Sequence, residues 1–178
     1  MRILIVGAAT LLASSGCMMG ARDLPQTASE ITGATAELRN AGGVTVGTAT
    51  AAPTGDGLRI NLTTTNLPAG VHAVHVHAVG SCTPPGFESA GPHWNPAGRQ
   101  HGTENPAGPH KGDLPNMTVA ADGRGSLSFE IPAAMLTGGT AAMLDGDGAA
   151  VVVHASGDDY RTDPSGNSGG RIACGVFR

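Results

Sequence analysis

The chain has 178 residues, of which 28 are glycine and 12 proline, while only 3% are aromatic and 13% charged. This composition disfavours long charged amphipathic helices and favours β structure rich in turns. The formal net charge of -4, without any cluster of lysine or arginine, argues against nucleic acid as a partner, because phosphate binding needs concentrated positive charge.

The N-terminal segment has the features of an export signal. Arg2 is followed by an apolar run over 3–13 and by small residues before Cys17. The run is too short to span a bilayer, which needs about 20 residues. Because "SSGC" resembles a bacterial lipoprotein processing site, we predict a signal peptide over 1–16 and a tether over 17–30 that is lipidated at Cys17. An ordinary secretory signal with an incidental cysteine stays the alternative.

The remaining part, 31–178, is long enough for one domain with a core and too short for two. Short runs of alternating small or polar and apolar residues follow one another along it, separated by turn signals. The runs are "ATAELRN", "GVTVGTATAA", "GLRINLTTTN", "HAVHVHAV", "NMTVAADG", "GSLSFEI", "TAAMLDGDG", "AAVVVHAS" and "GRIACGVF". Eight or nine short strands predict an all-β fold, an antiparallel sandwich or barrel.

Two intervals, 80–115 and 157–170, show neither a strand nor a helix pattern. Loops of this length without regular structure are usually functional or disordered. Disorder is the alternative for both, because glycine, proline, serine and asparagine are typical of solvated linkers.

The histidines indicate a function for these loops. His75 and His77 are two apart in a predicted strand and therefore project to the same face, where two imidazoles form a good chelate. His154 ends a very apolar strand, and the first loop adds four potential ligands. These are His93, His101, His110 and Asp113. Imidazole nitrogen suits copper and zinc, and histidines with one carboxylate form a normal tetrahedral zinc site. The sequence therefore predicts that a metal holds the first loop.

Six separated motifs carry a family resemblance. They are "HAVHVH", "AGPHWNP", "RQHG", "GPHKGDLPN", "VVVHASGDD" and "GNSGGRIACGVF". In this order they resemble the copper/zinc superoxide dismutase family, in particular its exported, lipoprotein-bearing bacterial branch. The resemblance implies a Greek-key antiparallel β-sandwich or flattened barrel of about eight strands with two long functional loops.

The resemblance also implies a ligand set for one copper and one zinc per chain. The implied copper ligands are His75, His77, His93 and His154. The implied zinc ligands are His93, His101, His110 and Asp113, so that His93 bridges the two metals. The seventh histidine, His72, matches a position that supports the ligands from behind without binding metal.

Further matches surround these ligands. Asp158 corresponds to a carboxylate that links a copper-ligand histidine to a zinc-ligand histidine, here His75 and His101. Arg171 corresponds to the guanidinium that receives the superoxide anion beside copper. Cys82 and Cys174 form an even pair in an oxidising compartment, which predicts one disulfide, and the resemblance implies the same pairing.

The implied activity is dismutation of superoxide to dioxygen and hydrogen peroxide, with His93 and Arg171 as catalytic residues, in protection of the bacterial cell envelope. We expect a periplasmic location and membrane contact only through the lipid anchor. A positive field near Arg171, aided by Lys111, is expected to attract the substrate. The alternative is a periplasmic copper- or zinc-binding protein that buffers or delivers metal. Nothing in the sequence decides between a monomer and a homodimer.

Overall fold

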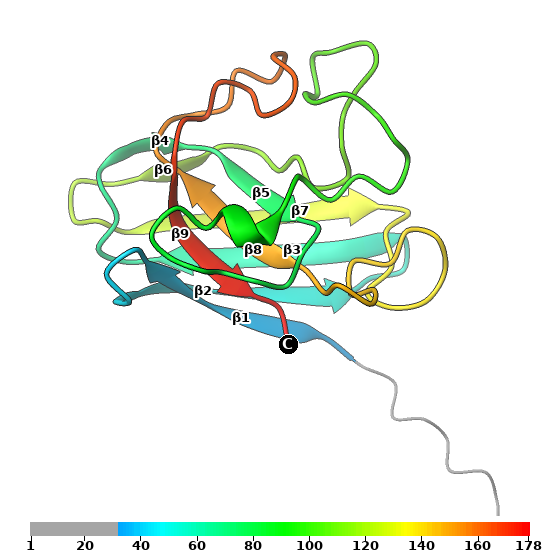
Figure 1. Cartoon of the computed structure of the whole chain (residues 1–178), viewed down its shortest axis with the longest axis horizontal. Helices are drawn as coiled ribbons and strands as arrows, with labels where there is room; N and C mark the ends of the chain where they lie inside the picture. Colours follow the sequence, from blue (N-terminus) through cyan, green and yellow to red (C-terminus); the bar gives the residue numbers. More distant parts are fainter. Residues whose placement is uncertain (1–31) are drawn as a thin grey trace, which may run out of the picture. The chain divides into compact units, whose positions relative to one another are not determined.

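The structure is a computed structural model that describes residues 32–178. The expected signal peptide over 1–16, and the tether over 17–30 with its Cys17, lie outside the described residues. Within the described part, no helix is long and apolar enough to cross a membrane. Nine strands and one turn of 3-10 helix form its regular structure (Figure 1). They are β1 (Ala34–Asn40), β2 (Thr45–Pro53), β3 (Gly57–Thr64), β4 (Gly70–His72), β5 (Val74–His77), η1 (Glu88–Ala90), β6 (Met117–Val119), β7 (Gly125–Pro132), β8 (Ala150–His154) and β9 (Arg171–Val176).

The strands form one antiparallel sheet in the order β4-β6-β7-β3-β2-β1-β9-β8-β5. The two ends of this order, β4 and β5, are separated in the chain by Ala73 alone. The Ala73 amide donates to the Ser156 carbonyl at 2.9 Å, and its carbonyl accepts from the His154 amide at 3.0 Å. The sheet therefore closes on itself into a nearly complete barrel, and the connections from β3 to β4 and from β7 to β8 cross over other strands in the Greek-key manner.

This architecture confirms the predicted all-β class. The number of strands is nine instead of about eight because the run "HAVHVHAV" is divided at Ala73 into β4 and β5. In β3, the buried residues Leu58, Ile60 and Leu62 alternate with exposed ones, since successive side chains of a strand point to opposite faces. Period-two alternation was thus a reliable guide to strands with one exposed face, such as β1 and β3.

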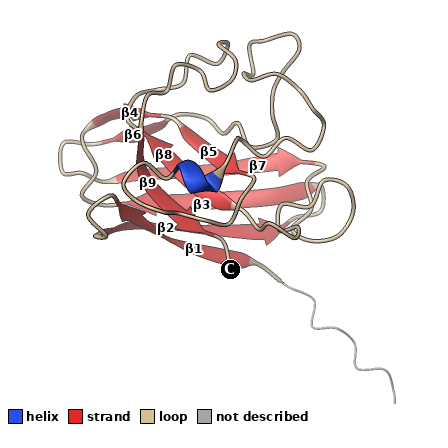
Figure 2. Ribbon diagram, viewed as in Figure 1, coloured by secondary structure: helices blue, strands red, loops and turns tan. Residues whose placement is uncertain are grey.

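Strand β8 is buried on both faces. Val151 and Val153 belong to the main core inside the barrel. On the opposite face of β8, Ala150 and Val152 belong to a second apolar cluster. Its other members are Phe87, Ala90 and Cys174, and Cys82 packs against it. Figure 2 shows η1 in front of β8 and β9, where the segment that follows Cys82 covers the outside of the barrel. This contact explains the continuous apolar run of β8.

One predicted strand is wrong. Residues 140–148 belong to a loop that folds back on the residues after β7, with hydrogen bonds from Met143 N to Met135 O (2.8 Å) and from Leu144 N to Leu136 O (2.8 Å). Leu136 and Met143 are buried against the main core, so the apolar residues of this loop only imitate a strand pattern.

The interval 80–115, expected to be irregular throughout, contains η1, and two of its residues form isolated β-bridges with residues of β5.

Candidate metal centre

Strand β5 places two histidines on the outside of the barrel. Val74 and Val76 pack in the main core, so His75 and His77 point to the opposite face. Both histidines are fully buried nevertheless, because the long loop that follows β5 covers them. The predicted shared face of the two imidazoles is what the structure shows.

His154, the last residue of β8, lies on the same outer face. Strand β8 pairs with β5, and its core positions are Val151 and Val153, which leaves position 154 outside the barrel. The ring centroid of His154 lies 4.8 Å from that of His75 and 5.8 Å from that of His77. Two neighbouring strands therefore bring three imidazoles together.

The first loop lies along the free edge of β5 and is held there by backbone hydrogen bonds. Val76 N donates to Gly112 O at 2.9 Å, Trp94 N donates to Val76 O at 2.8 Å, and Gly112 N donates to Trp94 O at 2.9 Å. A Cβ atom on Gly112 would collide with the Val76 carbonyl, so only glycine allows this close approach. The loop is ordered without being a strand.

The same edge contact sets the loop residues beside the strand histidines. Isolated antiparallel bridges pair His77 with His93 and His75 with Asp113. The ring centroid of His93 lies 4.0 Å from that of His75 and 4.9 Å from that of His77. Residues far apart in the sequence thereby converge on one buried place.

Four histidines form the first potential ligand group. They are His75, His77, His93 and His154, whose potential ligand atoms all lie within 4.8 Å of one another. Three of their nitrogen atoms are buried without a hydrogen-bond partner: His75 Nδ1, His77 Nε2 and His154 Nε2. The opposite nitrogens are hydrogen-bonded to Asp158 (2.8 Å), to the Gly91 carbonyl (2.8 Å) and to the Gly169 carbonyl (3.2 Å) respectively. Unpartnered buried nitrogens are costly, and a bound cation would satisfy all three.

The second group surrounds one carboxylate oxygen. Asp113 Oδ1 lies 2.9 Å from His93 Nδ1, 3.1 Å from His101 Nδ1 and 3.1 Å from His110 Nδ1. The His101 nitrogen is close but does not have hydrogen-bond geometry, and it counts as unpartnered. The four residues expected for zinc thus lie together. The set here whose potential ligand atoms all lie within 4.8 Å of one another contains His75 in place of His110.

Asp158 connects the two groups. Its Oδ2 lies 2.8 Å from His75 Nε2, and its Oδ1 lies 3.0 Å from His101 Nε2. Asn116 holds the backbone of Asp158 on both sides, accepting from its amide at 2.8 Å and donating to its carbonyl at 2.9 Å. Gly166, with φ of +63°, lies so close that a Cβ would collide with the Asp158 carboxylate. The carboxylate is therefore positioned by two loop residues.

His72 differs from the other histidines. Its Nδ1 lies 2.8 Å from the carbonyl of His154, and its Nε2 lies 2.9 Å from the carbonyl of Pro68. Since both ring nitrogens face backbone oxygens, neither is available to a metal. The structure places His72 behind the residue that ends β8.

Burial keeps most of these imidazoles neutral. It lowers the pKa of His77 to about 2, of His154 to about 3 and of His93 to about 4. Burial opposes ionisation of Asp113 as well, but its contacts with His101, His110 and His93 outweigh that effect and lower the pKa of its carboxyl group. Neutral imidazole and ionised carboxylate are the forms that coordinate metal ions.

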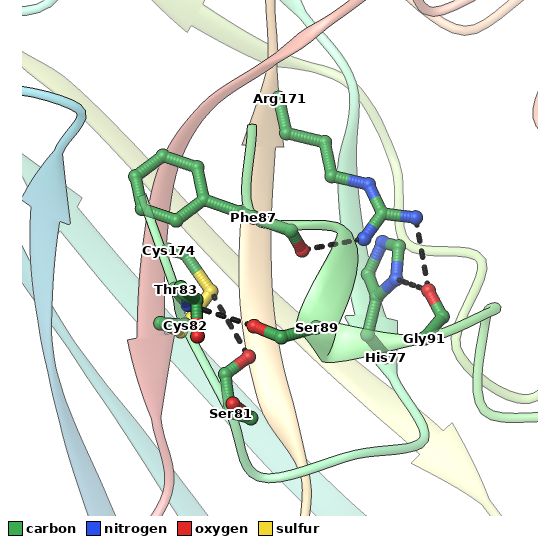
Figure 3. Close-up of a disulfide and its surroundings, with 9 residues drawn as sticks. All are labelled: His77, Ser81, Cys82, Thr83, Phe87, Ser89, Gly91, Arg171 and Cys174. Atoms are coloured by element: carbon green, nitrogen blue, oxygen red, sulfur yellow. Dashed lines mark hydrogen bonds between the residues drawn. A yellow bond between two sulfur atoms is a disulfide. The ribbon is translucent and has the colours of Figure 1, made fainter. Parts of the chain in front are cut away.

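Arg171, at the start of β9, lies beside the first group. Its Nη1 donates to the Phe87 carbonyl at 2.7 Å, and its Nη2 donates to the Gly91 carbonyl at 2.9 Å (Figure 3). The Gly91 carbonyl also accepts a hydrogen bond from His77 Nδ1 at 2.8 Å. The guanidinium is half-buried and fixed by loop carbonyls.

The predicted disulfide is confirmed. Cys82 and Cys174 are bonded, with a Cα–Cα distance of 5.7 Å and a sequence separation of 92. Figure 3 shows the bond beneath the loop that carries Phe87 and Gly91. It joins the start of the first loop to β9, the strand of Arg171.

Comparison with known proteins gives the family of the chain. The model of the copper/zinc superoxide dismutase family matches residues 42–177. The chain belongs to this family. A curated Cu-Zn superoxide dismutase of Aquifex aeolicus is 42% identical over 147 residues, 80% of this chain and 85% of that protein. One of Caulobacter vibrioides is 44% identical over 143 residues, 79% of each chain.

Solved structures agree. The crystal structure of a SOD-like protein from Bacillus subtilis has a TM-score of 0.76 at 41% identity, covering 80% of this chain and 96% of that one. The Cu/Zn superoxide dismutase from Brucella abortus has a TM-score of 0.65 at 30% identity, covering 82% and 99%. The chain is thus an oxidoreductase that dismutates superoxide and uses copper and zinc as cofactors.

Several residues of the site were not predicted. Asn116 and Gly112 lie in the motif "GPHKGDLPN", and Gly166 is the first residue of "GNSGGRIACGVF". The contacts of these three residues depend on how separate segments of the chain meet, which the motifs do not show. Lys111, expected near Arg171, instead donates from Nζ to the Pro132 carbonyl at the end of β7.

Proposed function

We propose that the two ligand groups are the copper and zinc sites of this dismutase. Copper is held by His75, His77, His93 and His154. Zinc is held by His93, His101, His110 and Asp113. The observation that carries this assignment is the set of buried ring nitrogens without hydrogen-bond partners, three in the first group (His75, His77 and His154) and one in the second (His101). Their opposite nitrogens are fixed by hydrogen bonds, as is usual for metal-binding histidines.

When bound, copper supplies one-electron redox chemistry and zinc supplies a fixed positive charge. The residues of the chain bind the anion and manage protons. Arg171 offers the superoxide anion an always-charged guanidinium that loop carbonyls hold in place. His93 Nδ1 faces Asp113 of the second group, so its Nε2 is the ring atom on the side of the copper group, where it can take up a proton whenever it is not serving as a ligand and pass that proton to the substrate. Two superoxide anions and two protons give one dioxygen and one hydrogen peroxide.

A metal-buffering protein is the less favoured alternative. Such a protein needs ligands, but it needs neither an anion-binding guanidinium at the copper group nor a histidine common to both groups. Arg171 and His93 supply both features here. A relative of known structure from Bacillus subtilis is named only SOD-like, so activity has to be measured together with metal content.

Two matched variants test the ligand assignment. His154→Ala should lose copper and keep zinc, because His154 belongs only to the first group. Asp113→Ala should lose zinc and keep copper. Elemental analysis of the purified proteins gives both ratios, and unfolding temperatures show that each variant is folded. Retention of copper by His154→Ala, or of zinc by Asp113→Ala, would contradict the assignment.

We also propose that the enzyme protects the bacterial cell envelope, on its periplasmic side, and is anchored through a lipid on Cys17. The sequence "SSGC" after an apolar run supports this proposal. Cys17→Ser should release the protein from the membrane fraction into the soluble fraction. Mass spectrometry of the N-terminus of the mature wild type identifies the lipid, and an unmodified Cys17 would contradict the anchor.

Sedimentation of the domain 31–178 distinguishes a monomer from a homodimer.

A further inference from the structure

A pocket opens over the copper group from the side of the solvent. Its lining includes His93, His154, Arg171, Arg99 and Asp163. His93 and His154 are members of the proposed copper site, so this pocket is the route by which an anion reaches that site. Arg99 is exposed at its rim, whereas Arg171 is half-buried.

The arginines of residues 32–178 differ in their partners. Four of them form ion pairs with carboxylates: Arg39 with Glu37, Arg59 with Glu130, Arg124 with Asp122 and Arg161 with Glu104. Arg99 and Arg171, which line the pocket, have no carboxylate within ion-pair distance in this part of the chain. Neither charge is therefore paired directly with a carboxylate, and Glu88 acts on Arg171 only from beyond ion-pair distance.

The backbone of Arg99 is held in a fixed place relative to the copper group. Asn95 Oδ1 accepts from the Arg99 amide at 2.9 Å, and Asn95 Nδ2 donates to the Arg99 carbonyl at 2.8 Å. Asn95 follows the buried pair His93 and Trp94, and the Trp94 indole donates to the Ala142 carbonyl at 3.1 Å. The side chain of Arg99 is exposed, but its backbone belongs to a turn that these hydrogen bonds hold in place.

We propose that Arg99 is the outer cation that attracts superoxide into the pocket and passes it to Arg171. This inference rests on the proposed function. The chain has a formal net charge of -4, which repels an anion at long range. The pocket lining has two arginines against one carboxylate, that of Asp163, which accepts the His101 amide at 2.6 Å. A local positive field at the pocket opposes the repulsion from the rest of the molecule.

The dependence of the rate on ionic strength distinguishes electrostatic attraction by Arg99 from a structural role. Attraction by an exposed charge extends over about 30 Å at 0.01 M ionic strength but only about 3 Å at 1 M. Arg99 should therefore act on the rate of anion capture at low salt and have little influence at high salt. A residue that only stabilised the loop would affect the rate equally at both.

The test compares Arg99→Glu with Arg124→Glu in the metal-loaded protein. The two substitutions change the net charge equally, and Arg124 is an exposed residue away from this pocket. We expect Arg99→Glu to lower kcat/KM for superoxide about threefold to tenfold at low ionic strength, while Arg124→Glu stays near the wild type. The difference should vanish toward about 1 M salt. Arg99→Lys should keep most of the rate, because the charge is what acts.

Azide, a small monovalent anion, provides a readout that is independent of turnover. Its dissociation constant, followed by the absorption of the copper site, should rise in Arg99→Glu at low salt by a factor similar to the loss in rate. Copper and zinc contents should be unchanged. If Arg99→Glu matches Arg124→Glu in both assays while the wild type dismutates, the role of Arg99 is refuted alone. A metal-loaded wild type without dismutation refutes the proposed function, and the azide titration still decides the role of Arg99.

Discussion

His77 and Arg171 donate hydrogen bonds to one acceptor, the carbonyl oxygen of Gly91, at 2.8 and 2.9 Å. The bond fixes which nitrogen of His77 carries hydrogen, and it leaves Nε2 without a partner in the first ligand group. One backbone atom therefore orients a proposed copper ligand and the residue that we propose docks the anion. The disulfide between Cys82 and Cys174 holds the segment that carries this atom.

Replacing Arg171 by alanine should separate anion docking from metal binding. We expect both metals to remain, because the His77 bond to Gly91 does not need the guanidinium. The rate should fall by about tenfold or more, since a charged docking group at the reacting centre is lost. Arg59→Ala is the control, because it removes an arginine of β3 that is paired with Glu130 of β7. Pulse radiolysis of superoxide decay gives the rates, and an unchanged rate would remove the docking role.

Loss of the disulfide should affect both stability and activity. The bond closes a loop of 92 residues, so Cys82→Ser with Cys174→Ser should lower the free energy of unfolding by about 2–5 kcal/mol. Activity of the folded double variant should also decline, because the carbonyls of Phe87 and Gly91 that hold Arg171 lose their anchor. Denaturant titration and rate measurements on the same sample check both. Full activity without the bond would show that the segment is held by other contacts.

The sequence predicted the strands and the residues that cluster in the two potential ligand groups far better than the loops. Alternation identified the barrel strands because each side chain of a strand faces either the core or the outside. Alternation failed at 140–148, which is a loop in which Met143 is buried against the main core. The candidate ligands were identified from residue type and motif, and the structure brings them together. The positioning contacts of Asn116 with Asp158 were not, because they arise only where two loops meet.

Gly166 provides a test of the link between the two ligand groups. Gly166→Ala should displace the Asp158 carboxylate by collision and strain a backbone with φ of +63°. Both His75 and His101 then lose a partner, and metal affinity should fall about 10- to 100-fold. Gly170→Ala, in the same loop, has open space around the added methyl group and should bind metal normally. Competition with a chelator measures the affinities. Equal values for the two variants would contradict the role of Asp158.

The metal-free protein should lose stability as the pH falls below neutrality. In the folded state, burial holds the pKa of His77 at about 2 and that of His154 at about 3, below the ordinary value of 6.5. The unfolded chain therefore takes up protons as the pH falls through 6.5 while the folded chain does not, which favours unfolding. For His101, burial is outweighed by contacts with Asp113 and Asp158, which raise its pKa to about 9. Between pH 7 and about 6 this residue therefore adds a little stability, which the two other histidines outweigh, and below about pH 6 it is protonated in both states and has no further effect.

Thermal unfolding of the metal-free protein between pH 7 and pH 4.5 measures this dependence. We expect the Tm to fall by at least about 5 °C over the interval. The variant His77→Ala should show a smaller fall, since one of the responsible groups is gone. A Tm that stays constant or rises toward pH 4.5 would contradict the burial of neutral imidazoles.

The central claim is that this chain is a dismutase with one copper and one zinc at the two adjoining ligand groups. The most direct measurement is elemental analysis of the purified domain together with superoxide decay, before and after copper is added. We expect about one copper and one zinc per chain and rapid decay that depends on copper. Stoichiometric metal without catalysis, even after copper loading, would contradict the claim and indicate a metal-binding protein.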